Sequence, residues 1–375
     1  MRVNQLTITQ VRNLQNPSLN FSPRLNIFFG PNAAGKSSIL ESLYILGNGR
    51  SFRTTKHNNV ITENNHDFTL FAKVESSDIN HQLGFNRQRN GDTTIKLNSE
   101  PVNRLSTLAK LCPVQILSPE QYDLLVKGPG ARRKQLDWGV FHVEHSVLEV
   151  WQKTNKILQH RNKLLKQKSG YSDVSVWDNQ LVSLSEQVTQ LRQAYCDKIN
   201  PLFSQLCQQF LGQLDIKINL FPGWTDKHSI GLSAIYREQF EKDKKLGFTQ
   251  SSIQKADLKF LIDGTKSAGD YLSRGQQKLL ITAFKLAQLK VMQAYGQQAP
   301  VFLLDDIGAE LDERHQNQLL DLLASQPNNQ QIFITCVHLE PLKPLISHCD
   351  DLKLFHVEHG VVKEVAKDEI EVYEA

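Results

Sequence analysis

Residues 30–38 read Gly30-Pro31-Asn32-Ala33-Ala34-Gly35-Lys36-Ser37-Ser38, which is the Gly-x-x-x-x-Gly-Lys-Ser spacing of a phosphate-binding loop. The strand-type run from Leu25 to Phe29 precedes this loop, and apolar residues at helical spacing follow it from Ile39 to Leu46. Strand, glycine loop and helix are the elements that the motif requires. Their agreement favours a phosphate-binding loop over an ordinary turn that contains two glycines.

Each residue type in the loop has a physical role. Small residues let backbone N–H groups surround phosphates, and the N-terminus of the following helix adds partial positive charge. We expect Lys36 to bridge the β- and γ-phosphates of ATP as a catalytic group, and the Ser37 hydroxyl to coordinate Mg²⁺. The predicted nucleotide contacts in this segment are Gly30, Pro31, Asn32, Ala33, Ala34, Gly35, Lys36, Ser37 and Ser38.

A pair of acidic residues follows a second buried strand near the other end of the chain. The apolar run from Val301 to Leu304 leads directly into Asp305 and Asp306. Open α/β sheets bind ligands at the carboxyl ends of their parallel strands, so this run predicts carboxylates at that edge. Asp305 suits Mg²⁺, directly or through water, and Asp306 suits the polarisation of an attacking water. A further buried strand is expected from Gln331 to Thr335.

A third polar segment precedes the strong helix expected from Leu279 through Leu289. It reads Tyr271-Leu272-Ser273-Arg274-Gly275-Gln276-Gln277-Lys278. Serine is a preferred residue at the start of a helix, so we expect Ser273 to cap this one. The capped helix would provide a second N-terminus with partial positive charge, which can bind an anion.

The spacing of these segments predicts the domain organisation. A chain of 375 residues is long enough for roughly two domains. Because Lys36 and Asp305 lie 269 positions apart in the chain of 375 residues, an insertion must divide the nucleotide domain. We expect an α/β fold with an ATPase lobe in two halves, residues 1–140 and 256–375, and an inserted helical arm, residues 141–255. The lobe combines a mixed sheet with an antiparallel β addition between Phe52 and about Leu117.

The arm shows helical periodicity. Trp177, Leu181, Leu184, Val188, Leu191 and Tyr195 form a heptad seam, and the pairs 150–151, 157–158 and 164–165 recur at seven-residue steps. Two helices separated by Ser169-Gly170 are therefore expected to pair antiparallel. A further helix is expected after Pro201, and alternating apolar residues from Leu214 to Leu220 predict a strand.

The charge distribution says more than the net charge. The chain has 43 basic and 39 acidic residues, a formal charge of +4, which does not by itself indicate a nucleic-acid binder. The segment 151–168, however, has no acidic residue and contains Lys153, Lys156, Arg161, Lys163, Lys166 and Lys168. Lys163, Lys166 and Lys168 are candidates for a DNA or partner face, and a solvated helix surface is the alternative.

Arg132 and Arg133 follow Gly128-Pro129-Gly130 and suit either phosphate contacts or a solvated helix start.

Composition excludes several other classes of protein. The longest apolar runs, such as Val301 to Leu304, are far shorter than the about 20 residues of a membrane span. The first residues lack the apolar stretch of a secretory signal, so we expect a cytoplasmic protein without a membrane partner. Five cysteines without a C-x-x-C pair predict reduced thiols in the core.

These motifs together carry a family resemblance. The order of phosphate loop, LSRGQ segment, LLDD strand and Glu310-Leu311-Asp312 resembles ABC-type ATPases of the SMC and Rad50 group. Further segments are similar to the bacterial RecF family of recombination mediators, namely Val11-Arg12-Asn13, residues 46–53, Pro119-Glu120, Gly128-Pro129, Arg132-Arg133 and Leu136-Asp137.

The resemblance implies a slow, DNA-stimulated ATPase of DNA repair, DNA replication and the SOS response to DNA damage. It implies a homodimer around two ATP that binds gapped DNA or single-strand/duplex junctions and helps RecO and RecR load RecA. In the family's pattern Asp305 binds Mg²⁺ and Asp306 stands in place of the usual catalytic glutamate. Ser273, Gly275 and Gln276 would form the signature that reaches the partner subunit's γ-phosphate.

The chain also departs from the pattern. Arg274 stands where the wider signature has glycine, Cys336 where transport ATPases place a histidine, and Gln135 where an aromatic residue is common. Ser252 to Lys255 replaces an expected Gly-Pro-His-Arg type segment. These departures concern hydrolysis and the arm rather than nucleotide binding. The alternatives are a Rad50-like or OLD-like partner of a nuclease and a transporter-type ATP-binding subunit.

Overall fold

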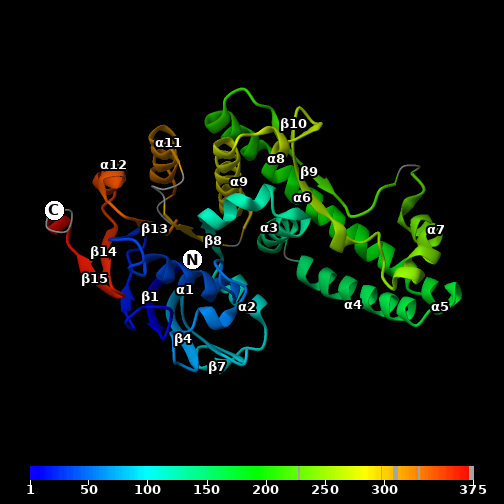
Figure 1. Cartoon of the computed structure of the whole chain (residues 1–375), viewed down its shortest axis with the longest axis horizontal. Helices are drawn as coiled ribbons and strands as arrows, with labels where there is room; N and C mark the ends of the chain where they lie inside the picture. Colours follow the sequence, from blue (N-terminus) through cyan, green and yellow to red (C-terminus); the bar gives the residue numbers. More distant parts are fainter. Residues whose placement is uncertain (145, 227–228, 297, 307–310, 328–329, 371–375) are drawn as a thin grey trace. The chain divides into compact units, whose positions relative to one another are not determined.

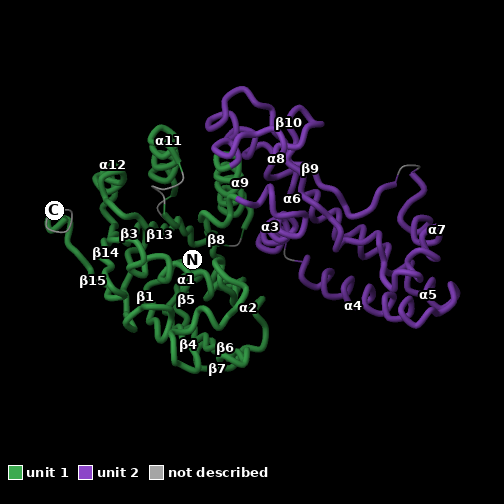
Figure 2. The backbone as a smooth tube through the Cα atoms, viewed as in Figure 1, with its two compact units in different colours: residues 1–122, 278–375 green, residues 123–277 purple. Residues whose placement is uncertain are grey.

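The computed structural model describes residues 1–144, 146–226, 229–296, 298–306, 311–327 and 330–370 (Figure 1). The chain forms two compact units (Figure 2). Unit 1 comprises residues 1–122 and 278–375, and unit 2 comprises residues 123–277. Unit 2 therefore includes residues 123–140 and 256–277, which the sequence analysis assigned to the ATPase lobe. One reason is that β10 (Asp257–Ile262) pairs along its whole length with β9 (Ile216–Phe221).

The central sheet of unit 1 has the strand order β15-β14-β3-β13-β12-β8. Five of these strands are parallel, and β15 pairs antiparallel with β14 at the edge. Every residue of β3, β8, β12 and β13 is buried, which explains why these segments are apolar except for Asn26, Gln115 and Thr335. The strands are β3 (Leu25–Phe29), β8 (Val114–Leu117), β12 (Val301–Leu304), β13 (Ile332–Cys336), β14 (Leu352–Glu358) and β15 (Val361–Val365).

A second sheet of unit 1 is antiparallel and has the order β2-β1-β4-β5-β6-β7. Its strands are β1 (Arg2–Thr9), β2 (Ser18–Asn20), β4 (Asp67–Ser76), β5 (Ile79–Gln88), β6 (Thr93–Leu97) and β7 (Glu100–Pro101). The expected antiparallel addition is confirmed for β4, β5 and β6, and the N-terminal strands also join it. The end of the expected range is different, because β8 pairs parallel with β12 in the central sheet. In β4 alternate residues are buried, as one face of the sheet requires.

Helix α1 (Lys36–Asn48) shares one apolar core with both sheets. Ile39, Leu43 and Leu46 of the helix belong to this core together with Leu70 of β4 and Leu303 of β12. The core therefore fixes the position of the helix that begins at Lys36. Unit 1 also contains α2 (Leu105–Leu111), α11 (Glu313–Ala324), α12 (Lys343–Ser347) and 3-10 turns at His57–Asn59, Glu340–Leu342 and Lys367–Glu369. The sequence boundary between the units falls within α9 (Arg274–Tyr295) and within the 3-10 turn Pro119–Leu125.

Unit 2 is mainly helical. Its helices are α3 (Gly128–Val143), α4 (Val147–Lys166), α5 (Tyr171–Ser175), α6 (Asp178–Leu211), α7 (Gly231–Leu246) and α8 (Ala268–Tyr271), with a 3-10 turn at Ile253–Lys255. A small sheet has the order β11-β10-β9, where β11 is Lys266–Ser267. The expected seam packs Leu181 and Leu184 of α6 against Ile157 of α4. Tyr236 of α7 joins the same cluster, so a third helix contributes that the sequence analysis did not predict.

Arg161 is not part of the basic face. Its side chain has no exposed area, and its guanidinium forms ion pairs with Asp178 at 2.8 Å and Asp243 at 2.9 Å. The guanidinium also lies 4.7 Å from the ring centroid of Tyr236. A buried charge is stable only when it is paired and hydrogen-bonded, and two carboxylates from α6 and α7 provide that pairing. Arg161 therefore belongs to the basic segment 151–168 in the sequence but adds nothing to the exposed charge of that segment.

Pro201 does not begin a new helix. Helix α6 continues through it from Asp178 to Leu211, although proline removes one backbone hydrogen bond and costs about 3 kcal/mol inside a helix. Phe203, Leu206 and Phe210 are buried beyond the proline. The amide of Asn200 exchanges hydrogen bonds of 2.9 and 2.8 Å with the backbone of Ile218 in β9. Tertiary packing therefore offsets the local cost.

No helix within the described ranges has both the length and the apolar character needed to cross a membrane.

Burial of His142 predicts an acid sensitivity of the fold. Burial lowers the pKa of His142 in α3 to about 3, whereas the unfolded side chain titrates near 6.5. Between these values the unfolded state binds the additional proton, so stability is complete above pH 6.5 and is lost as the pH falls toward 3. At pH 5 the loss is about 2 kcal/mol.

Urea unfolding of the wild-type chain and of His142→Phe, at pH 7 and pH 5, measures this effect. Phenylalanine keeps the ring packing against Trp138, whose centroid lies 4.7 Å away, but has no proton to bind. The variant should lose about 2 kcal/mol less between the two pH values. His66→Phe, at an exposed position, is the control and should behave like the wild type. Equal pH dependence in all three proteins would show that His142 is not the group concerned.

Candidate nucleotide site

The phosphate loop connects β3 to α1, as the sequence predicts. Gly30 has φ +136°, Gly35 has φ +118° and Ala33 has φ +63°. A Cβ atom on Gly30 would lie 2.3 Å from the carbonyl oxygen of Val357, so only glycine fits there. The loop lines a cavity of about 430 Å³ whose wall includes Asn32, Ala33, Ala34, Gly35, Lys36, Ser37 and Ser38.

Lys36 lies at the base of this cavity. Its Nζ donates hydrogen bonds to the carbonyl oxygens of Gly30 at 2.7 Å and Pro31 at 2.8 Å. Burial lowers the pKa of Lys36, while Asp306 and Asp305 oppose that change. The ammonium group is therefore held by the backbone of the loop, while the Lys36 residue lines the cavity. An anion in the cavity would offset the cost of burying the Lys36 ammonium group.

Ser37 and Asp305 meet at the same edge of the sheet. The Ser37 hydroxyl donates to Asp305 Oδ1 at 2.8 Å, and the Thr335 hydroxyl donates to the same oxygen, also at 2.8 Å. Strand β13 lies between β3 and β12, which is why a residue from its end reaches Asp305. Burial raises the pKa of Asp305, and the hydrogen bonds from Ser37 and Thr335 lower it. The sequence analysis did not assign Thr335 to the site.

Ser37 and Asp305 fit a magnesium ion. Mg²⁺ prefers oxygen ligands at about 2.0–2.1 Å in octahedral geometry, in which neighbouring ligands are about 2.9 Å apart. The 2.8 Å between the Ser37 and Asp305 oxygens matches that separation. Such an ion would also offset the burial of the Asp305 carboxylate.

Asp306 lies on the wall of the cavity and adopts φ +55°, a conformation that aspartate and asparagine tolerate better than most residues. Its backbone N–H donates to the Thr335 hydroxyl at 2.8 Å. The strand end therefore turns sharply after Asp305 and presents the second carboxylate to the cavity. This position suits a group that accepts a proton from water.

Three cavity residues have no role in the sequence analysis: Arg12, Asn13 and Arg53. Asn13 Nδ2 donates to the Ala33 carbonyl at 3.2 Å and so supports the loop. Arg12 binds the fully buried Glu41 of α1 with two hydrogen bonds of 2.9 Å, and Ser51 donates to the same carboxylate. Arg12, Asn13 and Arg53 occur in the segments that carry the family resemblance, which is the only signal that could have identified them.

In unit 2, Ser273 caps helix α9. Its Oγ accepts the Gln276 N–H at 3.3 Å, and its own N–H donates to Gln276 Oε1 at 3.0 Å, which is a capping box. Ser273, Arg274 and Gly275 are exposed. A Cβ atom on Gly275 would have no neighbour within 4 Å, so this helix end has open space for a ligand or another chain.

The candidate basic residues of unit 2 differ in their surroundings. Arg132 binds Asp257 with hydrogen bonds of 2.8 and 2.9 Å, and Arg133 donates to the Ala256 carbonyl at 2.8 Å. A phosphate would have to compete with these internal partners. Lys163, Lys166 and Lys168 are exposed, and the first two lie in the last turn of α4. These lysines remain available for an external anion.

The departure Cys336 and the resemblance residue Asp312 can be placed, and the resemblance residue Glu310 cannot. Cys336 ends β13 and is buried. Glu310 lies outside the described residues. Asp312 accepts the His315 N–H at 2.9 Å and caps α11, which also lowers the pKa of Asp312.

Comparison with known proteins gives consistent matches. Residues 2–362 match the family described as RecF/RecN/SMC N terminal domain. The chain is 38% identical over 363 residues to the DNA replication and repair protein RecF of Shewanella piezotolerans, covering 96% of this chain and 99% of that protein. It is 37% identical over 362 residues to the protein of the same name from Psychromonas ingrahamii, with the same coverage.

Solved structures also match. The structure described as the recombination mediator protein RecF-ATP in the RecFOR pathway has a TM-score of 0.84 and 26% identity, covering 97% of this chain and 98% of that one. The Smc head domain of Pyrococcus furiosus has a TM-score of 0.59 at 14% identity, covering 100% of this chain and 98% of that one, which indicates a shared fold.

Proposed function

This chain belongs to the RecF family within the RecF/RecN/SMC group, and from that membership we propose that it is an ATP-dependent DNA-binding protein of replication and repair. Its fold is the α/β fold of ABC-type ATPases. The observation that carries the proposal is that Lys36 and Ser37 line one cavity and that Ser37 donates a hydrogen bond to Asp305, since this combination serves a nucleoside triphosphate with Mg²⁺. The similar RecF structure is described as an ATP complex.

In the proposed ATP complex, Lys36 turns from the Gly30 and Pro31 carbonyls to the β- and γ-phosphates. Ser37 and Asp305 hold the magnesium ion, which when bound neutralises charge on the phosphates. Thr335 keeps the Asp305 carboxylate oriented through its 2.8 Å hydrogen bond. Asp306 accepts the proton of the attacking water.

The site needs a second copy of the chain to be complete. Ser273, Gly275 and Gln276 lie at an exposed helix N-terminus that suits a γ-phosphate. We assign them to the partner's nucleotide in a homodimer that holds two ATP. Because ATP then joins the two copies, hydrolysis loosens the dimer and acts as a slow timer, which DNA stimulates.

The finer cellular role follows from the family. RecF is the protein named in the RecFOR pathway, and we place this chain in that process, together with RecO and RecR. It would act in the cytoplasm on gapped DNA or single-strand/duplex junctions and assist the loading of RecA. The matches to proteins named RecF over nearly the whole chain favour this role over a transporter subunit or a nuclease partner.

Sedimentation velocity and gel shifts with ATP, ADP and no nucleotide test the proposal. With ATP the chain should dimerise and bind gapped duplex more tightly than intact duplex. With ADP or without nucleotide both effects should be weak. DNA binding should weaken as salt rises, because phosphate contacts release counterions. DNA binding that is equal with and without ATP would contradict the ATP dependence.

Charge reversal tests the basic end of α4. If Lys163, Lys166 and Lys168 contact DNA phosphates, changing all three to Glu should weaken DNA binding at least about tenfold. The slope of log affinity against log salt concentration should become less steep by the amount that about three phosphate contacts contribute. ATP-dependent dimerisation should be unchanged. Fluorescence anisotropy with labelled gapped duplex measures the affinity.

Lys242, Lys245 and Lys217 of the same unit are also exposed, and their combined change to Glu is the control for net charge. Equal losses in the two triple variants would show that general charge, and not the end of α4, is responsible. Unchanged DNA binding and unchanged partner capture by the α4 variant would assign its lysines to a solvated helix surface.

A further inference from the structure

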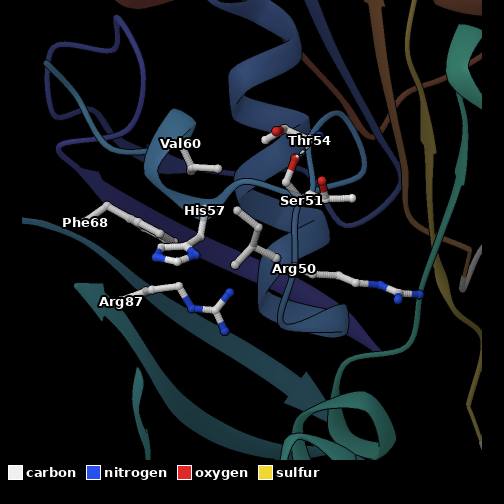
Figure 3. Close-up of a pocket in the computed structure, with 9 residues that line it drawn as sticks. Arg50, Ser51, Thr54, His57, Val60, Phe68 and Arg87 are labelled. Carbon is white, nitrogen blue, oxygen red and sulfur yellow. Dashed lines mark hydrogen bonds between the residues drawn. The ribbon is translucent and has the colours of Figure 1, made fainter. Parts of the chain in front are cut away.

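Unit 1 has a second cavity that shares no lining residue with the nucleotide cavity. We call it the Arg87 pocket (Figure 3). It has a volume of about 190 Å³ and lies where the end of α1, the segment after it and strands β4 and β5 meet. Its lining residues are Ile45, Arg50, Ser51, Thr54, Thr55, His57, Val60, Phe68 and Arg87. The wall is basic and hydroxyl-rich, whereas Ile45, Val60 and Phe68 provide an apolar floor.

The pocket has cationic side chains, and none of the described residues that line it is acidic. Within the described chain neither Arg50 nor Arg87 forms an ion pair. Burial lowers the pKa of Arg87, and no carboxylate opposes that change. A partly buried charge without a counter-charge is costly, so an anion in the pocket would stabilise it.

Neighbouring groups fix the Arg87 side chain in place. Its Nε donates to the Thr93 hydroxyl at 2.8 Å, and its guanidinium carbon lies 5.3 Å from the centroid of the Phe85 ring. In the described residues its terminal nitrogens have no hydrogen-bond partner. The guanidinium is thus held by one edge while the other donors stay available, an arrangement that suits two hydrogen bonds to one phosphate.

His57 is oriented in a similar way. Its Nε2 lies 3.0 Å from the carbonyl oxygen of Arg89, and because a carbonyl only accepts, Nε2 is the donor. Nδ1 of the same ring has no described hydrogen-bond partner. In Figure 3 the Arg50 side chain extends away from His57 and Arg87, and Arg50 is exposed. The positive charge therefore continues from Arg87 in the pocket to Arg50 in its surroundings.

The surroundings indicate a polyanion rather than an isolated anion. Residues 42–62 contain no acidic side chain, and Arg53 and Lys56 in this segment are exposed, as is Arg89 of the neighbouring hairpin. A volume of about 190 Å³ is below the roughly 300–1,000 Å³ of sites that enclose a whole small ligand. It suits a single phosphate group whose attached chain continues along the surface.

We propose that the Arg87 pocket binds a phosphate of the DNA backbone, with Arg87 as the principal contact and His57 beside it, and that Arg50, which extends away from both, contacts the adjoining stretch of the same DNA. This inference rests on the proposed DNA-binding function and names one surface that performs it. The pocket positions DNA through its backbone and does not select a base sequence.

Fluorescence anisotropy with labelled gapped duplex and ATP tests the proposal. The variants are Arg87→Gln, Arg87→Lys and Arg50→Gln, and Arg104→Gln is the control at an exposed arginine that lines neither pocket. We expect Arg87→Gln to bind DNA about tenfold more weakly, since a charge-assisted hydrogen bond is lost. The slope of log affinity against log salt concentration should become less steep by about 1, the contribution of one phosphate contact. Arg87→Lys should recover part of the affinity, and Arg104→Gln should match the wild type.

Separate outcomes distinguish this inference from the proposed function. Arg50 is exposed, so Arg50→Gln keeps the fold and should bind DNA more weakly even if Arg87→Gln proves unstable. If the wild-type chain binds DNA with ATP but Arg87→Gln and Arg50→Gln bind as well as Arg104→Gln, the pocket is not a DNA contact and the function stands. If the wild-type chain binds no DNA, both proposals fail.

A calorimetric titration with inorganic phosphate alone tests whether the pocket binds free phosphate instead of a phosphate of DNA. We expect weak binding, because one phosphate lacks the neighbouring charges of a DNA strand. Binding of inorganic phosphate that Arg87→Gln abolishes, while its DNA affinity stays that of the wild type, would overturn the proposal in favour of a free-phosphate site.

Discussion

Replacing Lys36 with methionine should reduce ATP affinity at least about a hundredfold, a loss of about 2.7 kcal/mol. Among the described residues that line the nucleotide cavity, Lys36 is the only lysine, and its Nζ lies within 2.8 Å of the Gly30 and Pro31 carbonyl oxygens at the start of the loop. Methionine has a similar length and fills the same buried position without a charge. Its fold should therefore persist, while ATP-dependent dimers disappear from a sizing column.

The control is Lys96→Met, at an exposed position of β6 that lines neither cavity. This variant should bind ATP and dimerise like the wild type, and both variants should keep the wild-type melting temperature. An undiminished ATP-dependent dimer of Lys36→Met would contradict the assignment of Lys36 to the phosphates.

Replacing Asp306 with asparagine should slow ATP hydrolysis about a hundredfold or more, because a general base contributes 10²–10⁴-fold. Asparagine tolerates the φ of +55° at this position and keeps the backbone hydrogen bond to Thr335. The variant should therefore fold, bind ATP and dimerise. Since hydrolysis releases the dimer in this account, the variant should also leave DNA more slowly.

Asp321→Asn, on the exposed side of α11, makes the same chemical change outside the site and should hydrolyse ATP at the wild-type rate. Single-turnover hydrolysis and stopped-flow DNA release measure the two effects. Wild-type hydrolysis or faster DNA release by Asp306→Asn would show that another group polarises the water.

The nucleotide loop is predictable from sequence because its geometry depends on neighbouring residues. Gly30 and Gly35 occur where the backbone requires positive φ, and a strand and a helix flank them. The meeting of Ser37 with Asp305 was also predictable, since both follow parallel strands at one edge of a sheet. Local patterns and one rule of sheet topology are sufficient for these features.

Other parts of the site depend on pairings that no local pattern indicates. The strand order places β13 beside β12, and only this order explains why Thr335 binds Asp305. The ion pair of Arg12 with Glu41 likewise joins the segment after β1 to α1, two parts of the chain that no local pattern brings together. From sequence alone, Arg12 is one of many basic residues.

The errors in unit 2 have the same origin. Arg161 belongs to a basic stretch in the sequence, but the carboxylates of Asp178 and Asp243 come from other helices and bury it. Pro201 is a helix-breaking residue, but apolar contacts on both sides of it maintain α6. In both cases, tertiary contacts outweigh the local preference of the residue.

The central claim is that one nucleotide is held between Lys36 of one copy and Ser273 of another. Sedimentation velocity with ATP tests it on Lys36→Met, on Ser273→Arg and on their equal mixture. Each variant alone should remain monomeric, because each of the two nucleotide sites in its dimer would contain the substituted residue. The mixture should form dimers, since one of its two sites combines an intact Lys36 with an intact Ser273. A mixture that stays monomeric, or dimers formed by Ser273→Arg alone at the wild-type level, would contradict the claim.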